Sequence, residues 1–225
     1  MNAVPSELRA RLAADYQPVR ALRSPWTRAL GVLPLGLMAL LAAPIVFDIR
    51  QDATRLGWIG LWGFSLLQSA IGFAVVAAAL RDSVPGRGWS RRALVLWLTL
   101  PIVAIVAVTM TSWQVSPVLL RGPWWAVLGM CFSGSAATAM PAVALGSVLA
   151  ARAYPTRPAL AGALIGLGAG LMADAGWRIF CHFSEPAHVL SAHLAAVVMS
   201  AVIGALVSVR LKPDTTGATP GRRAR

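Results

Sequence analysis

The sequence predicts an all-α membrane protein, a polytopic bundle of six transmembrane helices with both termini in the cytoplasm. Hydrophobic residues make up 57% of its 225 residues and charged residues only 12%, whereas a soluble domain carries about 25% charged residues. The mean hydropathy is +0.68. The apolar residues also gather in six runs, each close to the ~20 residues that cross a bilayer as a helix. The lipid bilayer is therefore the expected environment of the chain.

The predicted transmembrane domain covers residues 29–211. Its six spans are residues 30–47, 56–80, 93–113, 124–151, 159–180 and 190–211. Pro34, Pro44, Pro101 and Pro141 lie inside these runs, which a membrane bundle tolerates because neighbouring helices satisfy the freed carbonyl groups. The connections between the spans are short, so we expect no extramembrane domain between them.

Two polar segments flank the spans. Residues 1–28 are predicted to form a cytoplasmic leader with a short amphipathic helix that places Leu8, Leu12 and Tyr16 on one side. The leader is either a solvated tether whose arginines contact anionic lipid or a docking helix that binds a cytoplasmic partner through these three residues. Residues 212–225 are predicted to be a disordered cytoplasmic tail.

The distribution of positive charge predicts the orientation. The formal net charge is +12, which in a soluble protein would suggest a nucleic-acid partner. Here 16 of the 20 Lys and Arg residues lie in the leader, the second and fourth connections and the tail, and four lie on the other side of the spans. Short loops rich in basic residues stay in the cytoplasm. This asymmetry places both termini there and explains the charge without direct binding of nucleic acid.

Sequence motifs of enzymes are missing. The chain has no GxSxG, SxxK, HExxH or phosphate-binding P-loop, and Asp174 is the one acidic residue expected well inside a span. Paired carboxylates for acid–base catalysis or for holding a metal are also missing. We therefore expect no enzyme, no catalytic residue, no cofactor and no small-molecule substrate. A small transporter-like protein and a structural membrane subunit stay open as alternatives, although the spans show no inverted repeat of broken helices.

The most distinctive stretch covers residues 155–193. Gly162, Gly166 and Gly170 recur every fourth residue on the fifth span and predict a smooth stripe on which another helix packs closely. Beyond the stripe, one helical face carries a second set of residues, namely Asp174, Arg178, Cys181 and His182. Arg178 is in register to pair with Asp174. The pair is either a structural ion pair at the membrane edge or a device that tunes the neighbouring thiol.

The two cysteines are candidates for sensing chemistry. Cys131 lies about eight residues into the fourth span, ~12 Å below the outer surface, while Cys181 lies at the outer end of the fifth span. They are free, joined by a disulfide or bound to a metal, and the sequence does not decide among these states. His182, His188 and His193 follow within twelve residues of Cys181 and are possible modulators of the thiols. Cys181, Cys131 and His182 are the metal-ligand candidates, although their spacing fits no established ligand frame.

Several stretches of the chain resemble one bacterial family. They are Cys131 early in the fourth span, ARAYPTRPALAGALIGLGAG leading into the fifth span, WRIFCHFSEPAHVLSAH around the second cysteine, and YQPVRALRSPW in the leader. The chain resembles the NrsF-type regulators, negative regulators of sigma F, which are six-span anti-sigma factors of the bacterial inner membrane. HxxxCxxC, the zinc-binding motif of soluble anti-sigma factors, does not occur in this sequence.

The resemblance implies a function. A protein of this family would hold an extracytoplasmic-function sigma factor inactive at the membrane until stress arrives. Cys131 and Cys181 match the family's two cysteines and would sense metal or oxidative stress. The leader and the cytoplasmic loops 81–92 and 154–158 would bind the sigma factor. A change at the cysteines would shift the fourth and fifth helices against each other along the glycine stripe.

Overall fold

The computed structural model describes residues 5–15 and 22–211, and within these residues all regular structure is helical. The all-α prediction is therefore confirmed. The helices in chain order are α1 (Ser6–Asp15), α2 (Pro25–Ala29), α3 (Leu33–Phe47), α4 (Ala53–Trp58), the π-helical segment η1 (Ile59–Gly63), α5 (Phe64–Asp82), α6 (Arg91–Val115), α7 (Trp124–Ala151), α8 (Pro158–Phe180), α9 (Pro186–His188), the π-helical segment η2 (Val189–Leu194) and α10 (Ala195–Arg210).

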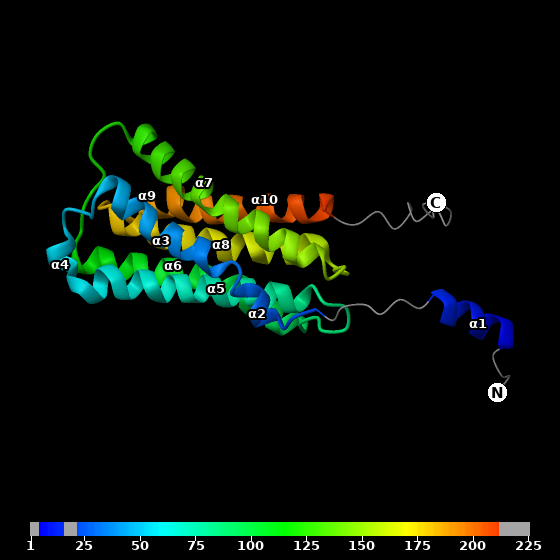
Figure 1. Ribbon diagram of the computed structural model, residues 1–225. Coiled ribbons are helices and arrows are strands. Elements are labelled where there is room, and N and C mark those ends of the chain that lie inside the picture. The colour runs from blue at the N-terminus through cyan, green and yellow to red at the C-terminus, as the bar shows by residue number, and fades with distance from the viewer. Residues whose placement is uncertain (1–4, 16–21, 212–225) are drawn as a thin grey trace.

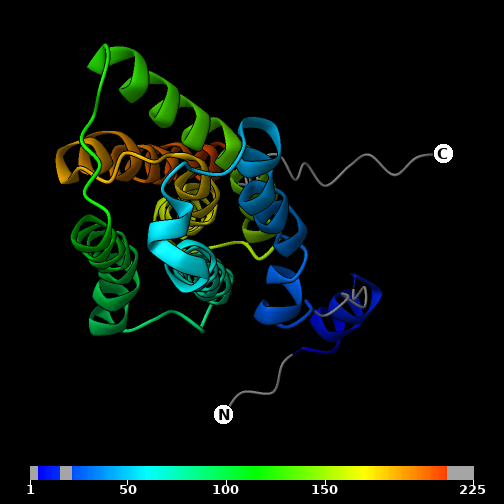
Figure 2. The ribbon, with the colours of Figure 1, turned by 90° about the vertical axis from the view of Figure 1, so that its left-hand side faces the viewer.

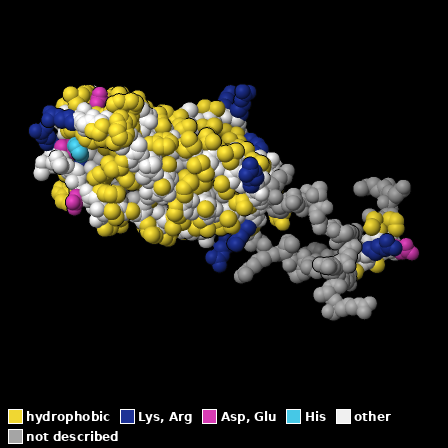
Figure 3. Space-filling view, turned by 90° about the horizontal axis from the view of Figure 1, so that it is seen from above, with side chains coloured by type: hydrophobic (Ala, Val, Ile, Leu, Met, Phe, Trp, Pro, Cys, Tyr) yellow, Lys and Arg dark blue, Asp and Glu magenta, His cyan; other side chains and the backbone are white. Residues whose placement is uncertain are grey.

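Six of the described segments are long and apolar enough to cross a bilayer, as predicted. They are Pro25–Phe47, Ala53–Asp82, Arg91–Val115, Trp124–Ala151, Pro158–Phe180 and Pro186–Arg210. The segments run side by side along one axis (Figure 1). Hydrophobic side chains cover the middle of the surface, and Lys and Arg gather toward its ends (Figure 3). This distribution matches a protein surrounded by lipid rather than by water.

The two ends of the bundle are named here by what they carry. The site end carries the connections 48–52, 116–123 and 181–185, and the terminal end carries the connections 83–90 and 152–157. The first and last described residues of the bundle, Leu22 and Leu211, both lie near Arg152 at the terminal end. The predicted tail 212–225 falls outside the described residues, so its disorder stays a prediction.

Helix α8 is the centre of the bundle. It packs against α3, α5, α6, α7 and α10, and an end-on view shows it in yellow with the other helices around it (Figure 2). In the most apolar 18-residue stretch of α8, 83% is buried. The corresponding share is at most 50% in each of the other spans. A helix in this position needs small side chains on several faces, because several backbones must approach it at once.

The glycine stripe of α8 faces α10. A Cβ at Gly162 would overlap the carbonyl oxygen of Gly204, and one at Gly166 would overlap that of Ser200. The expected sliding of the fourth helix against the fifth along this stripe is therefore wrong, because the stripe is occupied by the sixth span. The fourth span, α7, meets another face of α8, where Ile165 fills the space over Gly146.

The first span begins earlier than predicted, and this changes the role of Arg28. Arg28 lies in α2 and is buried instead of belonging to a solvated leader. Its guanidinium donates to the carbonyl oxygens of Leu149 at 2.7 Å and Leu80 at 3.4 Å. These carbonyls belong to the last turns of α7 and α5, whose final C=O groups have no partner within the helix. Arg28 thus joins the ends of three spans.

The close approach of α8 and α10 gives a stability prediction. Gly166→Ala should destabilise the protein by about 1–3 kcal/mol, because the new methyl group overlaps the backbone of α10. Gly129→Ala is the matched control, since a Cβ there meets nothing within 4 Å. Thermal unfolding of the detergent-solubilised variants measures the difference. Equal apparent Tm values for the two variants would contradict the packing described here.

Candidate thiol and imidazole site

Four buried side chains meet at the site end of the bundle, namely Cys131, Cys181, His188 and His193. One potential ligand atom of each lies within 4.8 Å of those of the others. The two sulfur atoms are 3.7 Å apart, and Nε2 of His188 lies 3.3 Å from Sγ of Cys181. Both cysteines are free thiols. The depth difference expected for the two cysteines therefore does not keep their side chains apart.

Three segments bring these residues together. Cys131 lies two turns into α7, and Cys181 is the residue that ends α8, in an extended conformation. Apolar side chains of both segments, with Ala192, surround the sulfur atoms: Val127, Leu128, Phe132 and Phe183. The thiols are thus buried, with apolar side chains over much of their surface.

The π-helical segment η2 places the two histidines on one side of the sixth span. Five residues separate His188 from His193, so an α-helix would turn them well away from each other. In a π-helix residue i pairs with residue i+5, which puts these two positions above one another. The imidazole rings are accordingly 5.3 Å apart in an edge-to-face arrangement. Such single π-helical turns are frequent at functional sites.

Asp174 contacts the cluster through His193. Its Oδ1 lies 2.7 Å from Nδ1 of His193, and its Oδ2 accepts a hydrogen bond from Nε2 of Gln68 at 2.7 Å. The carboxylate has no exposed surface. Since His193 belongs to the sixth span and Gln68 to α5, Asp174 of α8 joins three spans inside the apolar bundle.

The expected pairing of Asp174 with Arg178 is wrong. Among the ion pairs found in the described residues none joins these two side chains. Arg178 instead donates to Oγ1 of Thr109 on α6, at 2.8 and 3.1 Å. Spacing along α8 allowed the pairing, but His193 and Gln68 already occupy the two carboxylate oxygens.

A second arginine, Arg50, links the connection 48–52 to the end of α8. Arg50 forms a bidentate ion pair with Asp52, at 2.6 and 2.8 Å, and donates to the carbonyl oxygens of Arg178 and His182. Burial by itself would raise the pKa of Asp52, but the hydrogen bonds and charge of Arg50 outweigh it and lower that pKa. The pair therefore stays ionised while it holds the end of α8.

The environment also acts on the thiol that ends α8. The neighbouring Cys131 thiol, placed to donate to the Cys181 sulfur, lowers the pKa of Cys181. Burial opposes this change, and the imidazoles of His188 and His193 add to it, so the pKa lies well below its usual value. A thiolate at this position is the form that reacts with oxidants and binds metals.

The predicted site residues do not all join the cluster. His182 stays outside: its ring packs on Phe183 at 4.1 Å between centroids, and its backbone carbonyl accepts from Arg50. In the leader, Leu8 lies on α1 with 49% of its surface exposed. Leu12 belongs to the same helix, its side chain is outside the described atoms, and Tyr16 is outside the described residues.

Sequence reasoning missed three residues of this network: Gln68, Thr109 and Arg50. Gln68 has a signal that was available, since an amide in the middle of an apolar span is costly unless it finds a partner. Thr109 has none, because a threonine hydroxyl can bond to its own helix, as that of Thr109 does to the carbonyl of Ile105. Arg50 reads only as a loop residue in the sequence.

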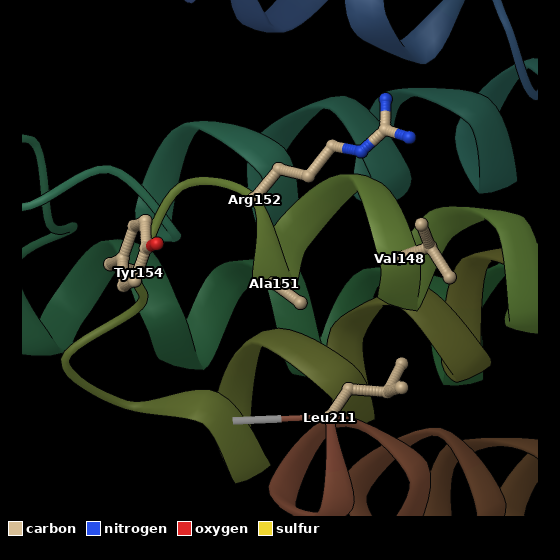
Figure 4. Close-up of a pocket in the computed structure, with 5 residues that line it drawn as sticks. All are labelled: Val148, Ala151, Arg152, Tyr154 and Leu211. Atoms are coloured by element: carbon tan, nitrogen blue, oxygen red, sulfur yellow. The ribbon is translucent and has the colours of Figure 1, made fainter. Parts of the chain in front are cut away.

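The terminal end offers a different kind of surface. A pocket of about 320 Å³ is lined by Val148, Ala151, Arg152, Tyr154 and Leu211, where the end of α7 faces the end of α10 (Figure 4). Tyr154 stands 63% exposed beside it and has a positive φ of 53°. Tyrosine is common at such a position, where a membrane span meets the aqueous phase.

The chain matches a known protein family. A family model described as NrsF, negative regulator of sigma F, matches residues 12–212. The match covers all six spans, both cysteines and both histidines of the cluster. Neither a curated protein nor a solved structure matches the chain.

The burial of both thiols predicts slow thiol chemistry in the folded protein. Cys131 and Cys181 expose 1% and 5% of their surface, so a maleimide should modify them at least about tenfold more slowly than an exposed thiol, because local opening must come first. The control is Ala187→Cys, at an exposed position near the same end, in a chain with both native cysteines changed to Ser. Intact-mass measurement in proteoliposomes follows the reaction. Modification of the native thiols at the rate of the control would contradict their burial.

Proposed function

Because the chain belongs to the family of negative regulators of sigma F, we propose that it is an anti-sigma factor that holds an extracytoplasmic-function sigma factor inactive at the bacterial inner membrane. The family match over residues 12–212 is the observation that carries this proposal. We propose no catalytic activity for the chain. Release of the sigma factor follows metal or oxidative stress, which the two cysteines sense.

Charge supports a cytoplasmic terminal end. The exposed basic residues of this end include Arg23, Arg87, Arg91, Arg92, Arg152, Arg157 and Arg210. Basic residues next to membrane spans stay on the cytoplasmic side. Both ends of the described bundle, Leu22 and Leu211, lie here too, so both termini are cytoplasmic in this proposal. The site end with its thiols then faces the periplasm.

The contacts at the terminal end support a single binding surface made of two loops. Arg157 of the 152–157 connection forms a 2.6 Å ion pair with Asp82, at the start of the 83–90 connection. The same carboxylate accepts from the backbone nitrogen of Trp89 at 2.8 Å. Together with exposed Tyr154, these loops form the surface that we propose for the sigma factor. The leader, with Leu8, Leu12 and Tyr16, is the second proposed contact.

The thiol pair supports the sensing proposal. Two thiols 3.7 Å apart need only a small movement to reach a disulfide, whose sulfur atoms are about 2.05 Å apart. In that reaction the thiols lose two protons and two electrons to an oxidant such as a peroxide. Binding of a metal would instead displace the thiol protons. Either reaction changes how α7 sits on the end of α8.

The connectivity provides a route from the sensor to the partner. α7 carries Cys131 at the site end, and α8 leads to Cys181; at the opposite end the 152–157 connection joins these two helices. A movement of α7 against α8 therefore changes the position of Tyr154 in the proposed binding surface. Such coupling requires two discrete arrangements of the helices.

The sensing proposal predicts the behaviour of cysteine variants. Cys131→Ser and Cys181→Ser should each abolish release of the sigma factor under metal or oxidative stress while repression in unstressed cells is kept, since the binding surface is intact. A reporter gene controlled by the sigma factor measures both. Ser133→Ala, on the exposed face of α7, is the matched control and should respond as the unchanged chain does. Full induction in both cysteine variants would sink the sensing claim.

A further inference from the structure

From the geometry of the cluster we infer that Cys131, Cys181, His188 and His193 together form a four-ligand site for a divalent cation of the zinc and cadmium class. The site has two sulfur and two nitrogen ligands, and Asp174 supports it as the partner of His193. This inference names the ligand of the sensor described above, and it depends on that proposal only for its regulatory consequence.

The sulfur–sulfur distance and one sulfur–nitrogen distance suit tetrahedral coordination. Zinc binds sulfur at about 2.3 Å and imidazole nitrogen at about 2.0–2.1 Å, with tetrahedral geometry in closed sites. Two sulfur ligands of such a site are then about 3.8 Å apart, and a sulfur and a nitrogen about 3.5 Å. The sulfur atoms of Cys131 and Cys181 are 3.7 Å apart, and Nε2 of His188 is 3.3 Å from the Cys181 sulfur. The other ligand-atom distances are at most 4.8 Å, so movements of about 1 Å would bring all four ligands to a closed site.

The second observation is the orientation of His193. Its Nδ1 faces the carboxylate of Asp174 at 2.7 Å, so Nδ1 is the nitrogen that donates to the carboxylate and Nε2 is the nitrogen left for a metal. This Nε2 is buried and has no hydrogen-bond partner among residues 5–15 and 22–211. A carboxylate that orients a histidine in this way is the usual support of a metal ligand. A purely structural cluster would instead leave this buried nitrogen unsatisfied, at a cost of about 1–3 kcal/mol.

Charge balance favours a divalent cation. With two exchangeable protons shared among them, the two cysteines and two histidines carry no net charge, and a divalent cation that replaces those two protons leaves the site neutral again. This matters because uncompensated charge inside an apolar bundle is costly. Around the cluster the charges of two carboxylates, Asp174 and Asp52, are offset by those of two arginines, Arg178 and Arg50, although Asp174 and Arg178 form no direct ion pair. Two sulfur and two imidazole ligands also select zinc-like ions over magnesium and calcium, which prefer oxygen.

A small cavity lies beside the cluster. It measures about 10 Å³ and is lined by eight residues, including Cys181, His193, Arg50 and Ser184. This volume is about the least that can hold one water molecule. The cavity lies at the site end, beside two of the four ligands, and Arg50 and Arg178 also line it.

The test is cobalt binding by the full-length chain, purified in detergent, reduced and stripped with a chelator. We expect one Co²⁺ per chain, a tetrahedral visible spectrum with thiolate-to-cobalt charge transfer, and release of two protons. Zn²⁺ or Cd²⁺ should bleach the spectrum by displacement. Measurements on the unchanged chain are enough to overturn the inference. Either no cobalt binding or an octahedral cobalt spectrum without thiolate bands would overturn it.

Variants test the ligand set. Cys131→Ser, Cys181→Ser, His188→Gln and His193→Gln should each lose the tetrahedral spectrum, and Asp174→Asn should weaken binding by about 10–100-fold while keeping it. His182→Ala is the matched control, because His182 lies next to the cluster without joining it, and it should bind as the unchanged chain does. Thermal unfolding shows that each variant is folded. An unchanged spectrum in both histidine variants would overturn the four-ligand site.

This test separates the metal site from the proposed function, since no sigma factor is present in it. Metal binding without stress-dependent release in cells would leave the site intact and refute metal sensing. Release that needs both cysteines in a protein that binds no divalent metal would refute the site and leave thiol sensing intact.

Discussion

The fold depends on one constraint: a carboxylate buried in an apolar bundle must find all its partners within the protein. Asp174 has no exposed surface, and its two oxygens are taken by His193 and Gln68. Because these partners come from different spans, the requirement fixes α5 and the sixth span on α8. Removing one partner would leave a buried polar group unsatisfied, which is expensive in hydrocarbon. The same requirement orients His193 toward the two thiols.

The central position of α8 connects this polar layer with the rest of the molecule. Glycines allow α10 and α5 to approach its backbone, through Gly166 on one face and Gly168 on another. A helix packed so closely on several faces has little room to bend. The thiol cluster lies at one end of this helix and the proposed binding loops lie at the other.

Hydropathy and spacing predicted much of the architecture and part of the site. The six spans follow from the length of the apolar runs, and the close approach at Gly162 and Gly166 follows from their spacing. The site could not be predicted in full, because an α-helical register separates His188 from His193, and only the π-helical turn unites them. The hydrogen-bond partners of Asp174 could not be predicted from α8 alone either, since Gln68 and His193 come from other spans. Arg28 shows the same limit, because its carbonyl partners are contributed by α5 and α7.

The most direct test of the central claim is affinity purification of the full-length chain from detergent-solubilised membranes of unstressed cells. The account predicts that an extracytoplasmic-function sigma factor co-purifies with it. A variant lacking residues 2–21, which retains Arg28 and the whole first span, shows whether the leader or the loops of the terminal end make the contact. Purification of the intact chain without any sigma factor would contradict the account.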